Sequence, residues 1–342
     1  MANRPRYTLE QLEQYFDRIC LPQAKRIFDV STLANDDQKL RFLNLLQKHQ
    51  LCKVPWENLT QHYSWHRTVN VQPQHLFTKI VRNAGRGGYC MEANHFFHTV
   101  LLSLGFDVYM AGARIHRAGG EYGGWTHVVN LVRIAGVRYL LDGGFGPQGP
   151  ARPVPLEHGV VSTQVAPAQC RVVFEALKQN LDQTQRVWVY EYRIDRTEGR
   201  EWTAMYCFTD LEFTPADVES MNFAPWLNKK SFFSHRVVAV RFTTSKEVSR
   251  EDANDAGARN HGVGYPDEQA MEGEIDGSVS INQDVLKWRR NGEVVFEWKF
   301  ASEDERVRAL EMYFGITLSE QDREAIQGTT TAIAAANIGL SF

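Results

Sequence analysis

Residues 86–94 read RGGYCMEAN and connect a glycine-rich turn to an apolar run that ends near Leu104. Gly105 follows at a position where helices commonly stop, so we predict a buried helix that begins at Cys90. The unpaired N–H groups and the dipole at a helix start favour a thiolate over a thiol. The preceding glycines should permit close approach of a substrate and supply free N–H donors for an oxyanion. A lone cysteine is more often a small buried hydrophobe, so this interpretation needs support from the rest of the chain.

The chain before this segment is predicted to be helical. Thr8 and Gln11 form a possible capping box for a first helix. Asp36 and Asp37 open a second amphipathic run, and a third extends from about residue 74 to residue 83. We therefore predict that residues 1–105 form a helical bundle that carries the cysteine.

After residue 105 the pattern changes to short β-type runs that are separated by glycine and proline. The predicted strands are 108–115, 126–134, 137–141, 171–174 and 187–194. This pattern is typical of a small barrel or sandwich, and we predict that residues 106–210 form a β-barrel.

Residues 211–342 contain both helical and strand patterns and are predicted to form an α/β lid. The predicted fold class of the whole chain is therefore α+β. Predicted strands cover 237–242 and 294–300, and a predicted helix covers 303–314. Residues 245–276 are polar and acidic without periodicity, which indicates a surface loop or insertion.

The spacing between His127 and Asp142 predicts that the two side chains meet. Ala135-Gly136 is a plausible two-residue hairpin turn. If Ile134 pairs with Val137, His127 lies opposite Gly144 and diagonal to Asp142 on the same face. Diagonal neighbours are roughly 7–8 Å apart at Cα, which is close enough for an imidazole–carboxylate hydrogen bond. A slip of one residue would place the two side chains on opposite faces. With Cys90 alongside, the set comprises a nucleophile, a base and an orienting carboxylate.

The composition limits the compartment and the partners. The net charge of −3 provides no broad basic surface for a nucleic acid or an anionic membrane. The five cysteines lack CxxC spacing, and we see neither a signal peptide nor a membrane span. We therefore expect a cytoplasmic protein with free thiols, no nucleic-acid partner and no membrane partner. The sequence does not indicate an oligomeric state.

Several segments together resemble the arylamine N-acetyltransferase family. In chain order the matches are PWENL at 55–59, RGGYCMEAN at 86–94, His127, DGGFG at 142–146, and DVESMN at 217–222 followed by SFF at 231–233. The resemblance implies the predicted arrangement of helical bundle, β-barrel and α/β lid. It also implies a cysteine-protease-like core in which Cys90, His127 and Asp142 are catalytic.

The resemblance further implies the substrates. The donor would be acetyl-CoA or another short acyl-CoA, used as a co-substrate with no bound cofactor. The acceptor would be an aromatic amine or hydrazine, in ping-pong transfer through a Cys90 thioester that serves xenobiotic detoxification. The residues expected near the acceptor are Phe145, Met91, Ile115, Pro147 and Gly149.

One departure from the family pattern leaves the acyl group open. Lys229 and Lys230 precede Ser231 in place of small polar residues. We expect these three residues to contact CoA, and the two ammonium groups could equally meet the carboxylate of a malonyl group or only water. A preference for malonyl-CoA or propionyl-CoA is therefore an alternative to acetyl-CoA.

Other functions remain to be weighed against acyl transfer. The same triad serves papain-like and transglutaminase-like hydrolases, which use water or a peptide amine. A silent binding module is disfavoured because all three triad residues are present. His95 and His98 with Glu92 could suggest a metal site, but they lack a cluster with ligand spacing, so we predict no metal. No motif assigns a role to the alanine-rich end at 329–342, although the resemblance implies that 338–342 approaches the active site.

Overall fold

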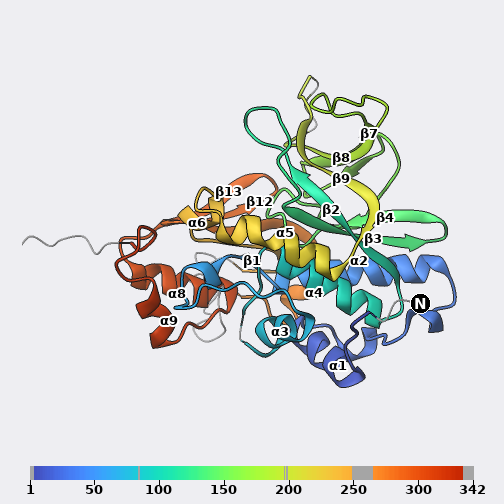
Figure 1. Ribbon diagram of the computed structural model, residues 1–342. Coiled ribbons are helices and arrows are strands. Elements are labelled where there is room, and N and C mark those ends of the chain that lie inside the picture. The colour runs from blue at the N-terminus through green and yellow to red at the C-terminus, as the bar shows by residue number, and fades with distance from the viewer. Residues whose placement is uncertain (1–3, 84, 196, 198, 249–264, 334–342) are drawn as a thin grey trace, which may run out of the picture.

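The computed structural model describes the chain except for residues 1–3, 84, 196, 198, 249–264 and 334–342. Helices gather at the N-terminal end, a strongly curved sheet follows, and a second sheet with its own helices forms the C-terminal part (Figure 1). The chain therefore has a mixed helix-and-sheet fold. Among the described residues, no helix combines the length and the apolarity that a membrane crossing requires.

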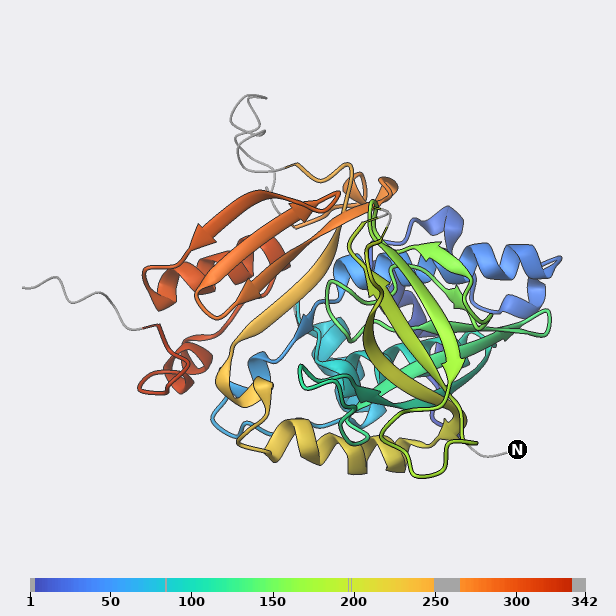
Figure 2. The same ribbon diagram turned by 90° about the horizontal axis from the view of Figure 1, so that it is seen from above.

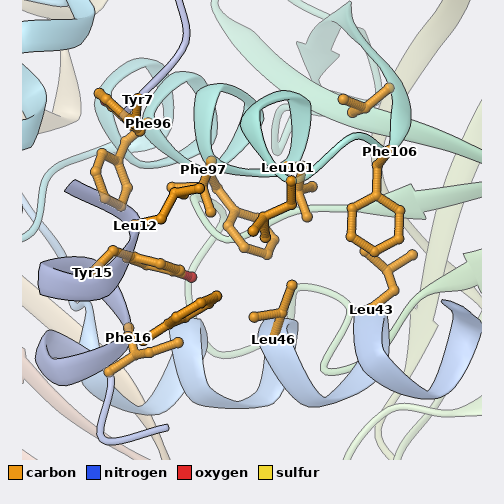
Figure 3. Packing of buried hydrophobic residues seen from close by; sticks show 14 of the residues in the cluster. Tyr7, Leu12, Tyr15, Phe16, Leu43, Leu46, Phe96, Phe97, Leu101 and Phe106 are labelled. Carbon is orange, nitrogen blue, oxygen red and sulfur yellow. The ribbon is translucent and has the colours of Figure 1, made fainter. Parts of the chain in front are cut away.

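The N-terminal helices pack around one aromatic-rich core. They are α1 (Leu9–Arg18), α2 (Asp36–Lys53), α3 (Pro73–Phe77), its continuation as a π-helical turn (Thr78–Arg82), and α4 (Cys90–Ser103). The predicted capping box of Thr8 and Gln11 is present at the start of α1. Figure 3 shows side chains from α1, α2 and α4 meeting between the helices, with Phe96 and Phe97 fully enclosed. This packing fixes the position of α4, whose first residue is Cys90.

Eight strands form the larger sheet. They are β2 (Asp107–Ile115), β3 (His127–Ile134), β4 (Val137–Leu141), β5 (Val154–Pro155), β6 (Val161–Thr163), β7 (Gln169–Glu175), β8 (Val187–Arg193) and β9 (Thr203–Phe213). Their order is β5-β4-β3-β2-β9-β8-β7-β6, so β5 and β6 are edge strands. A parallel bridge between His158 and Val172 draws the two ends together. The predicted barrel is therefore a nearly closed, barrel-like sheet.

The β3–β4 hairpin has the predicted register. Ile134 pairs with Val137, and Asn130 pairs with Leu141. Ala135 and Gly136 both have positive φ, at 52° and 80°, which matches the twist of a two-residue hairpin turn. This register sends the chain beyond β4 back towards the start of β3.

The C-terminal part contains a second sheet, seen on the left in Figure 2. Its strands, in spatial order, are β1 (Trp56–Glu57), β10 (Val238–Thr244), β11 (Ile275–Asn282), β12 (Val285–Arg290) and β13 (Glu293–Lys299). The helices of this part are α5 (Pro215–Leu227), α6 (Phe232–His235), α8 (Glu303–Phe314) and α9 (Glu320–Ala325). Strand β1 belongs to the N-terminal part of the chain and pairs Trp56 with Val240, so this part contributes a strand to the C-terminal sheet.

The remaining helical elements of the described residues are single short turns. They are Gln23–Lys25, Val30–Thr32, Leu59–Gln61 and Ala270–Glu272. The last of these and the start of β11 at Ile275 fall inside residues 245–276, the predicted surface loop or insertion, so the end of that segment has regular structure. Residues 249–264 of that segment lie outside the described residues, as do residues 338–342 of the C-terminal end.

Candidate active site

Cys90 is the first residue of α4, with Tyr89 at the N-cap. Its side chain belongs to a buried cluster whose partly exposed members include Trp56, Trp125 and Phe233. The Sγ atom lies 3.7 Å from the carbonyl oxygen of Thr126. The thiol therefore lies at a helix N-terminus, in a largely apolar setting.

His127 and Asp142 form a hydrogen-bonded pair beside this thiol. The Nε2–H of His127 donates to Oδ2 of Asp142 at 2.6 Å, and both side chains are almost completely buried. Burial alone would lower the pKa of His127, but the Asp142 carboxylate and a contact with Cys90 raise it to about 10. The pKa of Asp142 is lowered, because the pair with His127 and further hydrogen bonds outweigh the effect of burial. The arrangement thus supports an imidazolium held between a carboxylate and a sulfur.

Asn94 clamps the carboxylate from the same helix that carries the thiol. Its Nδ2 donates to Oδ1 of Asp142 at 2.8 Å and to the Val128 carbonyl at 2.6 Å. Its Oδ1 accepts the N–H of Gly143 at 2.8 Å. Because residues i and i+4 share a helix face, the thiol of Cys90 and the amide of Asn94 lie on the same side of α4.

Gly144 permits the turn after β4 to lie directly on the start of α4. A Cβ atom on this residue would stand 2.5 Å from Cα of Cys90 and 3.0 Å from its Cβ. The N–H of Gly144 donates to Oδ1 of Asp142 at 2.8 Å. The absence of a side chain at 144 therefore allows the carboxylate and the thiol to share one small site.

The expectation that the glycines before Cys90 provide free oxyanion donors is wrong. The N–H of Gly87 donates to Glu57 at 3.3 Å, and the N–H of Gly88 donates to the Pro55 carbonyl at 3.2 Å. A Cβ on Gly87 would lie 1.9 Å from the Pro55 carbonyl oxygen. These glycines are needed for packing against β1 and its flank, and their donors are already in use.

A buried network of charges supports the turn below Cys90. Arg86 donates to Glu57 at 3.0 Å, and Lys79 donates to Glu92 at 2.6 Å. Burial would raise the pKa of Glu57, but Arg86 and Lys79 lower it to about 2. Glu92 in turn accepts the N–H of Tyr89 at 3.2 Å. Glu57 and Glu92 therefore hold the residues that precede the nucleophile, which agrees with a structural role.

The residues predicted to contact the acceptor are spread over several environments. Phe145 packs edge-on against the His127 ring, with 5.7 Å between centroids, and also against Tyr206. Ile115, like Phe145, is half-buried against the core of the curved sheet. Met91 is completely buried. Contact of these side chains with an acceptor remains a prediction.

Pro147 and Gly149 are held together by one buried side chain. Gln164 donates to the carbonyls of both residues, at 3.1 and 2.7 Å. Pro147 lines a pocket of about 360 Å³ that also involves Arg289 of β12. The loop after Asp142 therefore reaches the second sheet.

Lys229 and Lys230 are exposed in the turn between α5 and α6, and Ser231 caps α6 through its side chain. Neither lysine takes part in an ion pair within the described part of the chain. They face solvent, so their assignment to CoA also remains a prediction.

Comparison with known proteins identifies the class to which this fold and site belong. A sequence model described as N-acetyltransferase matches residues 39–249. The chain belongs to the arylamine N-acetyltransferase family, and it is therefore an acyltransferase by class.

The sequence relatives divide into two groups by coverage. N-malonyltransferase FDB2 of Gibberella moniliformis is 30% identical and aligns over 94% of this chain and 93% of its own length. Its counterpart in Fusarium pseudograminearum is 31% identical over 95% and 93%. Arylamine N-acetyltransferase 2 of Mus musculus is 31% identical but covers 62% of this chain and 70% of its own length.

Solved structures show the same fold. The arylamine N-acetyltransferase of Mycobacterium abscessus superimposes with a TM-score of 0.69 at 20% identity, covering 95% of this chain and 98% of that one. The Mycobacterium marinum enzyme in complex with CoA gives a TM-score of 0.66 at 22% identity, covering 92% and 98%. At this level of identity the likeness concerns the fold alone.

Proposed function

We propose that this protein transfers a short acyl group from acyl-CoA to an aromatic amine or hydrazine through a thioester on Cys90. The observation that carries the proposal is the buried His127–Asp142 pair at the N-terminus of α4, beside the thiol. It supplies a nucleophile, a proton carrier and an orienting carboxylate in one apolar site. The family membership supports acyl-CoA as the co-substrate.

In the first half of the reaction, the Cys90 thiolate attacks the carbonyl carbon of the acyl-CoA thioester. We assign the N–H of Cys90, at the start of α4, as a donor to the developing oxyanion. The carbon–sulfur bond to CoA then breaks, and the imidazolium of His127 protonates the departing thiolate. Free CoA leaves, and the acyl group remains on Cys90.

In the second half, the amine nitrogen attacks the acyl carbon and passes its proton to His127. The bond to Cys90 breaks, which restores the thiolate and the imidazolium and releases an amide. Asp142 keeps Nε2 of His127 protonated, so Nδ1 is the nitrogen that exchanges protons. The acyl-CoA and the amine react with the enzyme one after the other, so the kinetics are ping-pong.

Among the short donors we favour malonyl-CoA over acetyl-CoA and propionyl-CoA. The support is the alignment with N-malonyltransferases over nearly the whole chain, whereas the acetyltransferase relative from mouse aligns over 62% of it. Lys229, Lys230 and Ser231 are proposed to contact the CoA phosphates, because ammonium groups and a helix cap suit anionic oxygens. Phe145 is proposed to pack on the aryl ring. All five cysteines are free thiols, which supports the proposed cytoplasmic location.

A donor panel tests this function and separates it from hydrolysis. Free CoA should be released at a rate that depends on a simple aniline, with parallel double-reciprocal plots for donor and amine. The rate of CoA release by Cys90→Ala should be at least ~10³-fold lower than that of wild type. CoA release that is fast without amine and unchanged by amine would instead assign a thioester hydrolase.

A further inference from the structure

Four consecutive carbonyls in the loop after Asp142 each accept a hydrogen bond from a buried side chain. They belong to residues 147–150. Gln164 donates to the first and the third of these carbonyls, at 3.1 and 2.7 Å. Tyr190 of β8 donates to the second, and Gln47 of α2 donates to the fourth, both at 2.9 Å. Surface loops usually leave such groups to water, whereas side chains from three separate elements hold the 147–150 turn in place.

Gln164 supplies two of these four hydrogen bonds. Its side chain is 2% exposed, and its amide nitrogen carries two hydrogens, one for each carbonyl. The backbone N–H of Gln164 donates to the Ala168 carbonyl at 3.1 Å, within the connection between β6 and β7. This bond fixes the point from which the side chain reaches the 147–150 turn. Removal of this one side chain would therefore release half of the bound carbonyls.

The 147–150 turn touches Phe145, which packs on the ring of His127. A Cβ atom on Gly149 would stand 3.2 Å from Cβ of Phe145, and the ring centroids of Phe145 and His127 are 5.7 Å apart. Pro147 and Gln164 also line the pocket of about 360 Å³ that reaches the second sheet. The turn therefore borders both Phe145 and open space. Because packing on the pocket side is incomplete, the hydrogen bonds of Gln164 are needed to keep the turn against Phe145.

The pair of His127 and Asp142 is held by other bonds. Asn94 of α4 donates to Oδ1 of Asp142 at 2.8 Å, and the remaining carboxylate oxygen accepts from His127. Gln164 takes part in neither contact. Loss of the Gln164 hydrogen bonds should therefore displace the turn and Phe145, and leave the imidazole–carboxylate pair in place.

We propose that Gln164 is a positioning residue for the acceptor, and that it sets the size of the aromatic amine that the acylated enzyme uses. The inference rests on the proposed acyl transfer and on Phe145 as the surface on which the aryl ring packs. It concerns the second half of the reaction, in which the amine attacks the thioester. A turn held by Gln164 favours a small, single-ring amine. A released turn is free to move towards the pocket, which enlarges the space beside Phe145 for a larger ring system.

The test compares wild type with Gln164→Met, a side chain of similar length that has no N–H to donate. With malonyl-CoA or acetyl-CoA as donor, kcat/KM for aniline should fall by ~10-fold, because two hydrogen bonds that fix the turn are lost. The ratio of kcat/KM for naphthylamine to that for aniline should rise by at least ~5-fold. Release of CoA in the first turnover without amine reports the first half of the reaction alone, and its rate should stay within about twofold of wild type. The NMR titration of His127 should also be unchanged.

Two further variants complete the test. Tyr190→Phe removes one hydrogen bond to the turn and keeps the ring, so the amine ratio should shift in the same direction by about two- to threefold. Gln183→Met is the matched control. The Gln183 amide likewise donates to two backbone carbonyls, those of Leu177 and Asn180, but it lies exposed in the connection between β7 and β8. This control should change neither the amine ratio nor the first turnover.

The outcomes separate Gln164 from the proposed function. An amine ratio that is unchanged in both Gln164→Met and Tyr190→Phe would overturn the role of Gln164 while the acyl transfer stood. Equal losses in the two halves of the reaction would do the same, because they would show a general effect on the fold. If wild type formed no acyl adduct on Cys90 with malonyl-CoA or acetyl-CoA, the proposed function itself would fail.

Discussion

Replacing Asp142 by Asn removes the charge that holds His127 in its protonated form. In the native site the pKa of His127 is raised from its ordinary 6.5 to about 10, against the effect of burial, by Asp142 and by Cys90. A shift of that size corresponds to roughly 5 kcal/mol of preference for the imidazolium, and the carboxylate is the largest favourable cause. The Asn94 amide already donates to one oxygen at position 142. The NH₂ group of the asparagine introduced at position 142 would then face Nε2 of His127.

An NH₂ group that faces Nε2 forces that nitrogen to act as an acceptor and places the ring proton on Nδ1. The ring then cannot take the proton of Cys90, as in the serine-protease precedent for this substitution, where the loss is ~10⁴-fold. We expect kcat/KM of Asp142→Asn to fall by ~10³- to 10⁴-fold, measured by CoA release with a fixed aniline.

The same variant should show a second, independent signature. Because the folded pKa of His127 is raised, the imidazolium and its stabilising contribution are fully present below pH 6.5 and are lost as the pH rises through about 10. Nitrogen NMR of His127 should therefore titrate near 10 in wild type and far lower in the variant. Asp210→Asn is the control, since Asp210 is exposed and pairs with Arg138 at 2.7 Å. A variant that kept its rate within tenfold, or lost it with an unchanged His127 titration, would refute this reasoning.

Three further changes probe the surroundings of the thiol. Asn94→Ala leaves the buried polar groups that Asn94 now hydrogen-bonds without a partner. The free energy of unfolding, measured by urea titration, should therefore fall by ~2–4 kcal/mol, and kcat should fall with it. Unchanged stability would contradict the role of Asn94 in holding the carboxylate. Gly144→Ala would place a Cβ 2.5 Å from Cα of Cys90, so thiol alkylation by iodoacetamide should slow by at least ~10-fold, while Ala at the open position Gly119, where nothing lies within 4 Å, should not slow it. The double change Lys229→Glu and Lys230→Glu should raise KM at least ~5-fold for every acyl-CoA alike, measured in initial rates; an unchanged KM would exclude these lysines from CoA binding.

The parts of the fold that the sequence predicted are those with a strong local pattern. The helix at 303–314 has the predicted bounds because its apolar residues repeat at helical spacing and Gly315 follows with a φ of 64°. The β3–β4 hairpin was predictable because a two-residue turn leaves only one register. That register is what placed His127 beside Asp142.

Some of the missed parts carried local signals that were overlooked, and others depend on tertiary contacts. Strand β11 (Ile275–Asn282) reads IDGSVSIN, in which Ile275, Val279 and Ile281 alternate with polar residues, and this alternation is a signal that could have revealed it. Helix α5 (Pro215–Leu227) was not predicted, although Thr214 caps it with Asp217 and Pro215 opens it, which are signals that could have revealed it. Strand β1 has two residues, and only its pairing with β10 makes it a strand.

In the active site, too, some features could be predicted from the sequence and others could not. The i, i+4 spacing of Cys90 and Asn94 would have predicted a shared helix face, although not which group the amide binds. The use of the glycine N–H groups by Glu57 and Pro55 could not be predicted, because those partners come from another segment.

The most direct measurement is the intact mass of the protein after brief exposure to malonyl-CoA or acetyl-CoA, followed by peptide mapping. The account predicts a single acyl group on Cys90, absent in Cys90→Ala, that disappears on addition of an arylamine without CoA and yields one equivalent of amide. An adduct on another residue, or turnover to amide with Cys90 never acylated, would contradict it.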